Sequence, residues 1–437
     1  MNLSKIMISL AVVAATAFSA RAVEPTLDAR RTASNYYAYP HPELPLDRLS
    51  AAPAGYEPFH IEHYGRHGSR WHIGQWVYRQ PIDLLRGAER DGKLTERGRR
   101  LMEYLRAIEL EARGHDGELT ALGAEQHRGI ARRMTANFPE IFGTDARIIA
   151  RSTDVVRCIL SMENELIEFS AFNPSAEITS DASKSTVRIL NYDDTMANRI
   201  HEAVYPMAMR EVTAAYNPDY EAFIMQIVSD PQYAADSVNT RDLFNSIFRI
   251  AANAQSHKGQ IAPYDLFTQK QLDDKWCFDN AEWFLRYGNT KLTDGTGPMR
   301  QRYLLRDIID SADSAIVSPR HGANMRFGHE VALMPLAVVM ELDSLGVEIN
   351  DLTKVADRWR NYEIFPMASN IQMVFYRPAG GSYTPDDVLV KVMLNERETA
   401  LPVSPVQGRY YRWSDLRRHY LDRLGSEGGK FAPDQPY

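Results

Sequence analysis

The stretch FHIEHYGRHGSR, residues Phe59 to Arg70, combines a strand pattern with a short cationic loop. Apolar and polar side chains alternate up to Gly65, which predicts a β-strand that ends at this glycine. The loop that follows places Arg66, His67 and Arg70 close together in the chain. Because ligands of open α/β sheets bind beyond the carboxyl ends of strands, the position of this loop predicts a binding site.

Two further segments repeat the order of strand, loop and helix. In RIIARSTDVVRCILSMENELIEF, residues 147–169, a short strand pattern precedes a Ser-Thr-Asp turn that can cap the following helix. The segment ANMRFGHEVALMPLAVVMEL, residues 323–342, shows the same order, and NIQMVFYRP and DVLVKVMLNE, residues 370–378 and 387–396, are strand candidates. Such units build an α/β domain, so we predict a central, mostly parallel sheet flanked by helices.

The middle of the chain differs in character from the segments on either side. Residues 176–305 are polar and aromatic, with helix patterns such as NTRDLFNSIFRIAANAQ and few strand patterns. We predict that they form an inserted, mainly helical cap domain. The chain then divides into a leader at 1–22, a first α/β part at 23–175, the cap at 176–305 and a second α/β part at 306–437.

The first residues and the overall charge limit the class of protein. Lys5 precedes the apolar run IMISLAVVAATAF, and Ala20-Arg21-Ala22 offers small residues at a cleavage position. We therefore predict a signal peptide over residues 1–22 and a periplasmic or secreted location. No later stretch is long and apolar enough for a membrane helix. The formal net charge of −7 disfavours a nucleic-acid-binding protein, whose surface should be basic.

The chain contains two cysteines, Cys158 and Cys277. An exported protein can join two cysteines in a disulfide, but sequence alone does not place these thiols within reach of each other. A disulfide and two free thiols therefore both stay open. Two cysteines this far apart do not form a four-ligand zinc motif by themselves.

The residue types around His67 favour an anionic ligand. The guanidinium groups of Arg66 and Arg70 match phosphate oxygens, the imidazole can act as a nucleophile or base, and the flanking glycines allow close approach of the backbone. The alternative is a surface loop with solvated arginines. A second R-H-G at residues 320–322 lacks the later arginine and is followed by a strand pattern. We interpret it as a loop that could line the site, not as the nucleophile.

A metal site is the second possibility for the same region. His60, His63, His67 and His72 cluster in the chain, and spacings of three and four residues would place ligands on one helical face. The glycines between them disfavour a helix, and the neighbouring arginines repel a cation. We therefore predict no metal ion and no other cofactor.

A second candidate region is FGHEVALMPL, residues 327–336. Proline is tolerated only near the start of a helix, so Pro335 indicates that the helix begins a few residues earlier. His329 and Glu330 then lie at the helix N-terminus, where the dipole and free N–H groups favour an anion. The carboxyl group of Glu330 could supply a proton once neighbouring negative charge raises its pKa, and a helix-capping role is the alternative.

The segment from Arg66 to Arg70 resembles the R-H-G-x-R signature of the histidine phosphatase superfamily. Further motifs occur in the order seen in the acid phosphatase and phytase branch: YEPFHIEHYGRHGSR, LTALGAEQHRGIARRMTANFPEIF, ARSTDVVRCILSMENEL, MRFGHEVALMPL and NIQMVFYR. Within this branch the chain most resembles multiple inositol polyphosphate phosphatases. The likeness covers most of the chain after the leader and is weak in the cap.

The resemblance implies roles for residues of the first and third of these motifs. His67 would be the nucleophile that becomes phosphohistidine. Arg66 and Arg70 would hold the phosphoryl oxygens, and Arg157 matches the third arginine of the family pocket, with a helix-surface arginine as the alternative. No metal or other cofactor is implied.

The resemblance also implies roles at the second candidate region. His329 matches the second histidine of the family pocket, which helps to bind phosphate, and Glu330 matches the acid that protonates the leaving alkoxide. Inositol polyphosphate phosphatases usually carry His-Ala-Glu, whereas in this chain the acid directly follows the histidine. That spacing is similar to the His-Asp pair of bacterial and fungal phytases.

Together these features predict an exported phosphomonoesterase that hydrolyses inositol polyphosphates, namely phytate and lower inositol phosphates. Its partner would be a small phosphorylated substrate and not a nucleic acid, and the sequence makes no prediction of oligomeric state. A broad-specificity histidine acid phosphatase is one alternative, and a non-catalytic binder of phosphorylated ligands is another. Further cations for a highly phosphorylated substrate are available at Lys184, Arg188, Arg320 and Arg326.

Overall fold

The structure is a computed structural model that describes residues 27–40, 49–258 and 262–425. The predicted leader at residues 1–22 lies outside the described residues. Within these ranges, no helix has the length and apolar character that crossing a membrane requires.

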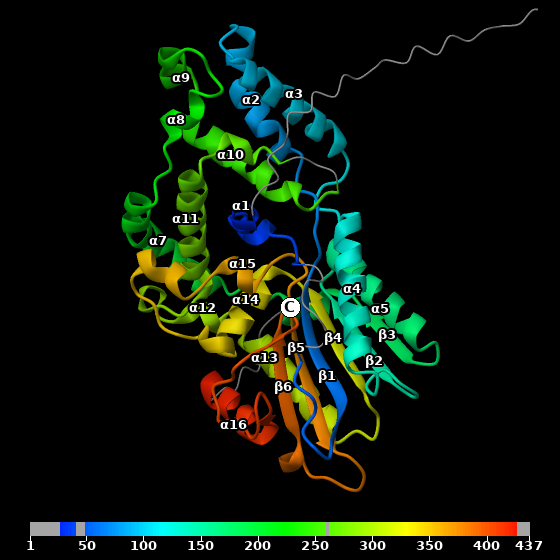
Figure 1. Ribbon diagram of the computed structural model, residues 1–437. Coiled ribbons are helices and arrows are strands. Elements are labelled where there is room, and N and C mark those ends of the chain that lie inside the picture. Colours follow the sequence, from blue (N-terminus) through cyan, green and yellow to red (C-terminus); the bar gives the residue numbers. More distant parts are fainter. Residues whose placement is uncertain (1–26, 41–48, 259–261, 426–437) are drawn as a thin grey trace, which may run out of the picture.

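In the described part of the chain, eight strands form one sheet at the base of the molecule (Figure 1). Its strands are β1 (Tyr56–Arg66), β2 (Arg147–Ser152), β3 (Glu177–Asp181), β4 (Gly322–Gly328), β5 (Asn370–Pro378), β6 (Leu389–Leu394), β7 (Arg397–Glu398) and β8 (Tyr411–Arg412). The order across the sheet is β3-β2-β4-β1-β5-β6-β7, and β8 pairs with β6.

Helices cover both faces of the sheet and extend beyond one end of it (Figure 1). They are α1 (Leu27–Arg31), α2 (Trp76–Arg90), α3 (Glu96–Glu111), α4 (Ala121–Asn137), α5 (Val156–Phe172), α6 (Lys184–Leu190), α7 (Thr195–Ala215), α8 (Tyr220–Ile224), α9 (Pro231–Ser237), α10 (Thr240–Ala254), α11 (Gln269–Tyr287), α12 (Thr296–Met299), α13 (Arg302–Ile316), α14 (Glu330–Val339), α15 (Asn361–Ile364) and α16 (Trp413–Leu424).

The predicted α/β fold with a flanked sheet is confirmed, but the sheet is parallel in one half only. Strands β1, β4, β2 and β3 pair in parallel, whereas β5 is antiparallel to β1 and β6 is antiparallel to β5. A short connection, which here leads from β5 into β6, can join antiparallel neighbours only. A buried apolar run does not reveal strand direction, so the sequence pattern could not distinguish the two halves.

Two apolar cores cover the two faces of the sheet. On one face, Ile61 and Met325 of the strands pack against α4 and α5. On the other, Tyr64 packs against α13 and α14, among them Leu333. Successive strand residues point to opposite faces, so the alternating pattern of β1 serves both layers.

A separate apolar core holds the helical body beyond the sheet. It joins α2 and α3 to α8 and α10, with Leu101, Leu105 and Ile108 of α3 all buried. Those three side chains follow one another at spacings of four and three residues, so they lie on one helical face. The predicted domain boundaries stay a prediction. In the structure, β3 of the expected cap range pairs in the sheet, and α2 and α3 add to the helical body.

Both cysteines are free thiols, so the disulfide alternative is wrong. Cys158 is buried and Cys277 is half-buried.

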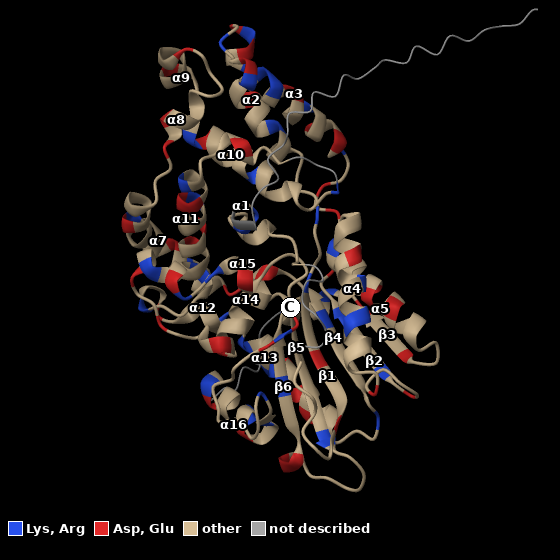
Figure 2. Ribbon diagram, in the orientation of Figure 1, with Lys and Arg blue, Asp and Glu red and all other residues tan. Residues whose placement is uncertain are grey.

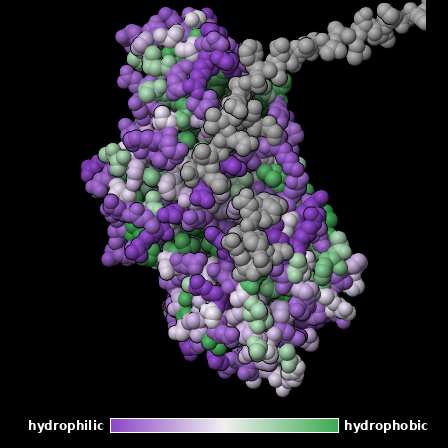
Figure 3. All heavy atoms as spheres, viewed as in Figure 1, coloured by the Kyte–Doolittle hydropathy of each residue, from purple (hydrophilic) through white to green (hydrophobic). Residues whose placement is uncertain are grey.

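Basic and acidic residues are interspersed along the outer helices (Figure 2). The face shown in Figure 3 is mostly hydrophilic, with apolar side chains in small scattered groups.

Candidate active site

The sheet brings three chain segments that are distant in sequence to one edge. Strands β1, β4 and β2 are adjacent and parallel, and Arg66 at the end of β1 pairs with Gly328 at the end of β4. Ser152 at the end of β2 pairs with Phe327 of β4. The loop after β1, the start of α14 after β4 and the start of α5 after β2 therefore meet at this edge.

The loop after β1 rests on the N-terminus of α4. A Cβ atom on Gly68 would lie 2.5 Å from the carbonyl oxygen of Gly123, so the two backbones touch. The backbone N–H of Ser69 donates to Gln126 Oε1 at 2.9 Å, and the Ser69 carbonyl accepts from the Thr120 N–H at 2.9 Å. These contacts fix the loop that carries His67, and they explain why TALGAEQ lies close to the R-H-G motif in space.

Gly123→Ala is expected to lower the free energy of unfolding by about 1 to 3 kcal/mol, because the new Cβ would overlap the backbone of the loop. That Cβ would lie 2.2 Å from the Ser69 carbonyl oxygen. Gly143→Ala is the matched control, since its Cβ would make only ordinary contacts, the nearest at 3.4 Å. Urea denaturation measures both, and equal stability of the two variants would contradict the close contact.

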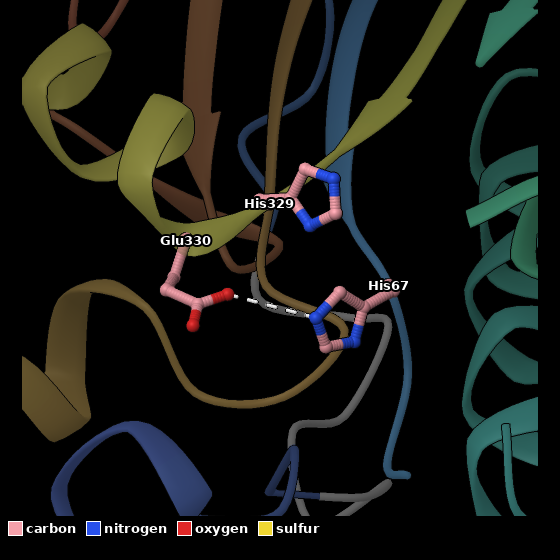
Figure 4. A group of neighbouring side chains, drawn as sticks. All are labelled: His67, His329 and Glu330. Atoms are coloured by element: carbon pink, nitrogen blue, oxygen red, sulfur yellow. Dashed lines mark ion pairs between the residues drawn. The ribbon is translucent and has the colours of Figure 1, made fainter. Parts of the chain in front are cut away.

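His67 presents one ring nitrogen to the site. Its Nδ1 lies 2.9 Å from the carbonyl oxygen of Gly68, so Nδ1–H donates there and the lone pair is on Nε2. Nε2 is buried without a hydrogen-bond partner and faces Glu330 Oε2 at 3.6 Å (Figure 4). Burial, reinforced by Arg157 and Arg66, holds the pKa of His67 well below its usual value, although Glu330 opposes this. The imidazole is therefore neutral and can act as a nucleophile.

Glu330 is the first residue of α14 and is almost fully buried. Burial by itself would raise its pKa, but Arg66, His67 and Arg70 outweigh burial and hold the pKa well below its usual value. Its Oε2 lies 3.1 Å from Arg66 Nε. The group is a carboxylate at neutral pH, at the helix N-terminus that the sequence predicts.

Three guanidinium groups surround the two histidines. Arg66 is fully buried and donates to the carbonyl oxygens of Phe365 and Asn35 at 2.6 and 2.8 Å. Burial, together with Arg70 and Arg157, lowers its pKa to about 10, although Glu330 opposes this. Arg66 therefore stays charged at neutral pH, and the site carries more positive than negative charge.

Arg70 and Arg157 both carry unpaired donors. Arg70 Nη1 donates to the Trp71 carbonyl at 2.9 Å, and its guanidinium lies over the ring of Tyr36. The Nε atoms of Arg70 and Arg157 are buried without hydrogen-bond partners. Burial and the charge of Arg70 lower the pKa of Arg157. Buried, unpartnered cationic donors are costly unless an anion joins them.

His329 closes the site from the β4 side. Its backbone N–H donates to Tyr64 Oη at 3.2 Å, and its Nε2 lies 3.2 Å from Thr153 Oγ1. The rings of His329 and His67 are 5.7 Å apart in an edge-to-face arrangement. Burial and the arginines lower the pKa of His329 to about 4, so this ring is a neutral hydrogen-bonding group at neutral pH and not a cation.

The structure does not gather the four histidines of the R-H-G region. His60 pairs with Glu62 at 2.8 Å, His63 packs against Phe327, and His72 contacts Tyr78. A different trio, His67, His329 and Glu330, has ligand atoms within 4.8 Å of one another. The guanidinium groups around that trio repel a cation, so the donor set fits an oxyanion better than a metal ion.

The second R-H-G does not line the site, which corrects that expectation. Gly322 begins β4 and pairs with His60, so the motif lies at the opposite end of the strand from His329. Arg320 forms an ion pair with Glu177 at that end. Because β4 follows this motif in the chain, the motif lies at the amino end of the strand. The site lies at the opposite, carboxyl end.

Of the other cations that the sequence offers for the substrate, Arg326 is engaged in ion pairs. Arg326 is fully buried and pairs with Glu62 and Asp307. Lys184 is exposed and Arg188 half-buried on α6, which follows β3. Arg326 is thus a structural ion pair inside the sheet layer.

Several residues of the site escaped the sequence analysis. Tyr64 accepts from His329 and donates to the Leu190 carbonyl, and Thr153 contacts the His329 ring. The sequence indicated these residues only weakly, because Tyr64 occupies one apolar position of a strand pattern and Thr153 lies in a turn pattern. The Asn35 and Phe365 carbonyls that hold Arg66 carry no side-chain signal at all.

Known proteins are similar to this chain in sequence and in fold. No family model matches. Multiple inositol polyphosphate phosphatase 1 of Homo sapiens is 22% identical over 399 residues, which cover 83% of this chain and 78% of the relative. The Gallus gallus protein of the same name is 22% identical over 399 residues, covering 87% and 85%.

Solved structures extend the comparison to the fold. The multiple inositol polyphosphate phosphatase of Bifidobacterium longum in complex with inositol hexasulfate aligns with a TM-score of 0.70 and 19% identity, over 92% of this chain and 99% of that chain. The phytase of D. castellii aligns with a TM-score of 0.64 and 13% identity, over 91% and 85%. These findings confirm the resemblance to the histidine acid phosphatase and phytase branch.

Proposed function

We propose that this protein is a phosphomonoesterase that hydrolyses phytate and lower inositol phosphates through a phosphohistidine intermediate. One observation carries the proposal: His67 Nε2 is neutral, buried and unpartnered beside Arg66, Arg70 and Arg157, and faces the carboxylate of Glu330. The names of the relatives, and the inositol hexasulfate bound to one structural neighbour, support the substrate class.

The first half of the reaction transfers the phosphoryl group to the protein. The lone pair of His67 Nε2 attacks phosphorus, the N–P bond forms, and the P–O bond to the leaving alkoxide breaks. Protonated Glu330 gives its proton to that oxygen. Because the phosphate group would bring negative charge beside Glu330, it would raise the low pKa of this carboxyl group and allow it to hold the proton.

The second half returns the protein to its starting state. Glu330, now a carboxylate, accepts a proton from water, and the water oxygen attacks phosphorus as the N–P bond breaks. The immediate products are inorganic phosphate, neutral His67 and protonated Glu330, and the carboxylate of Glu330 re-forms when its proton leaves with the phosphate. In both halves Arg66, Arg70 and Arg157 would stabilise charge on the phosphoryl oxygens, and losing one such group typically costs about a hundredfold in rate.

Acidification is expected to raise kcat/KM for an alkyl phosphate monoester, whose leaving alkoxide needs a proton, by about tenfold or more between pH 8 and pH 5. The pKa of His67 lies below its usual value, so the ring stays neutral as the pH falls through 6.5. Glu330 is a carboxylate, so the substrate must bring the proton, and phosphate monoester dianions take up one proton near pH 6. A rate that falls toward pH 5 with an apparent pKa near 6.5 would contradict a neutral His67.

Phosphate release from phytate and from p-nitrophenyl phosphate, measured in the presence of a chelator, tests the function. Release from phytate with strong preference over the aryl ester supports the proposed substrate class. Equal release from many monoesters favours the broad-specificity acid phosphatase. If phosphate is released from neither substrate, catalysis is rejected and the non-catalytic binder is favoured. The same arginines could bind the phosphorylated ligand of such a protein.

We further propose that the protein is exported to the periplasm or secreted, on the basis of the leader pattern at residues 1–22. N-terminal sequencing of the protein from fractionated cells tests this. A mature chain that starts near Val23 in the periplasm or medium supports export. An intact N-terminus in the cytosol rejects it.

A further inference from the structure

A second group of cations lies on the helical side of the candidate active site. Arg286 stands in the last turn of α11, Arg300 follows α12, and His201 lies on α7. Arg286 Nη2 and Arg300 Nη1 donate to the same oxygen, Asn198 Oδ1, at 3.2 and 2.7 Å. Arg300 Nε donates to the Arg286 carbonyl at 3.1 Å. The two guanidinium groups are thus adjacent and share one neutral acceptor.

The backbone holds these two arginines together. A Cβ atom on Gly297 would lie 2.3 Å from the carbonyl oxygen of Gly288, so α12 packs directly on the chain that leaves α11. Both guanidinium groups lie over the ring of Tyr287, at 5.7 and 5.4 Å from its centre. The aromatic ring offsets part of the repulsion between them. Asp194 and Asp193 act on the charge of Arg300, and the charge of Arg286 opposes the burial that raises the pKa of Glu282. Among the described residues, however, neither guanidinium group forms a direct ion pair with a carboxylate.

Nearby acids are engaged elsewhere. Asp194 pairs with Arg302 at 2.6 Å and caps α7 by accepting from the Ala197 N–H. Asp193 accepts from the Asn198 side-chain amide at 2.7 Å. Within the described residues, the hydrogen bonds of Arg286 and Arg300 go to neutral oxygens.

The cluster also contains unused donors. Arg300 is 5% exposed and His201 is 7% exposed. His201 Nε2 and Arg286 Nε are buried without hydrogen-bond partners. Burial, together with Arg286 and Arg300, lowers the pKa of His201 to about 4, so its ring is neutral at neutral pH and can donate one hydrogen bond. Two charges and a neutral donor, all short of partners, are the pattern that a buried anion satisfies.

Tyr287 connects this cluster with the acid of the candidate active site. Burial raises the pKa of the Tyr287 phenol; Arg286 and Arg300 oppose that rise, and the charge of Glu330 adds to it. Its ring stacks on Trp283, which packs against Phe365, and the Phe365 carbonyl holds Arg66. The cluster is therefore on the same side of the site as the carboxylate that faces the leaving group.

We propose that Arg286, Arg300 and His201 form a second anion subsite, which binds a phosphate group of the substrate that is not being hydrolysed. The proposal rests on the proposed function, because the leaving group must lie beside Glu330 for protonation. The inositol ring is that leaving group, and its remaining phosphates extend toward the α11–α12 side. The subsite selects substrates with several phosphates over monophosphates.

The single variants Arg286→Gln and Arg300→Gln test the subsite, since glutamine keeps a polar side chain without the charge. For inositol hexakisphosphate, KM is expected to rise between about tenfold and a hundredfold in each variant, as for loss of a hydrogen bond to a charged group. For p-nitrophenyl phosphate, which has one phosphate group, kcat and KM should stay within twofold of the unmodified protein. Arg302→Gln is the matched control, because that arginine already has a carboxylate partner.

The outcomes separate this proposal from the proposed function. The subsite is rejected if KM for inositol hexakisphosphate is unchanged in both variants. It is also rejected if kcat/KM falls equally for inositol hexakisphosphate and for p-nitrophenyl phosphate. Should the unmodified protein hydrolyse neither substrate, the proposed function fails and calorimetry decides the subsite. Inositol hexasulfate should then bind at least tenfold more weakly to Arg286→Gln than to Arg302→Gln, and equal affinities reject the subsite.

Discussion

Replacing His67 by alanine is expected to reduce phosphate release from every substrate by about 10⁴-fold or more, because the attacking nitrogen is removed. The remaining groups of the site would still bind the phosphate, so KM should change far less than kcat. Rapid acid quenching with radiolabelled substrate should trap a labelled histidine in the unmodified protein and none in His67→Ala. Steady-state phosphate release and this labelling are the two measurements.

A histidine outside the site provides the control for this variant. His419 on α16 pairs with Glu341 and is half-exposed, so His419→Ala should keep both turnover and labelling. His67→Ala should melt cooperatively, which separates lost chemistry from lost structure. Turnover within tenfold of the unmodified protein would mean that another group attacks phosphorus.

Replacing Glu330 by glutamine is expected to lower kcat for inositol phosphates by roughly 10²- to 10⁴-fold, the usual contribution of a general acid. Release of p-nitrophenolate needs no proton, so p-nitrophenyl phosphate should lose much less. Removing the carboxylate also removes a negative charge 3.1 Å from Arg66 Nε, so phosphate should bind more tightly to the variant. Comparison of kcat for alkyl and aryl esters, with Kd for inorganic phosphate, measures both effects.

The variant keeps the rest of the site in place, because Arg66 is also held by the carbonyl oxygens of Phe365 and Asn35. Glu341, which directly follows the C-cap of α14, is the control: it pairs with His419 and Arg423, and Glu341→Gln should leave kcat unchanged. An equal loss on alkyl and aryl esters in Glu330→Gln would assign Glu330 to orienting Arg66 and not to proton transfer.

The spatial neighbours of His67 show how far the sequence reaches. The strand that ends at Gly65 and the cationic loop after it follow from local pattern, and both lie where predicted. Arg157, His329 and Glu330 were placed beside that loop on resemblance and helix-start signals, and the sheet brings all of them together. Contacts of this kind depend on parallel pairing of β1, β2 and β4, which alternation of side chains does not encode.

The sequence was a poor guide to cations outside the central pocket. Arg320 and Arg326 were available by count, but one pairs at the far end of β4 and the other is inside an ion-pair network. Arg286 and Arg300 were not singled out in the sequence, and only packing of α12 on the chain that leaves α11 makes them neighbours. The sequence shows which residues are charged, but only the tertiary structure shows whether a charged residue has a partner.

By itself, the sequence determined the α/β class, the cationic loop at the end of a strand and the acid at the start of a helix, because each of these follows from residues close together in the chain. The tertiary structure alone decided which half of the sheet is parallel, which arginines meet, and that His67 and His329 are neutral while Glu330 is ionised. The physical reason is that ionisation depends on burial and on charges only a few ångströms away, which distant segments of the chain supply.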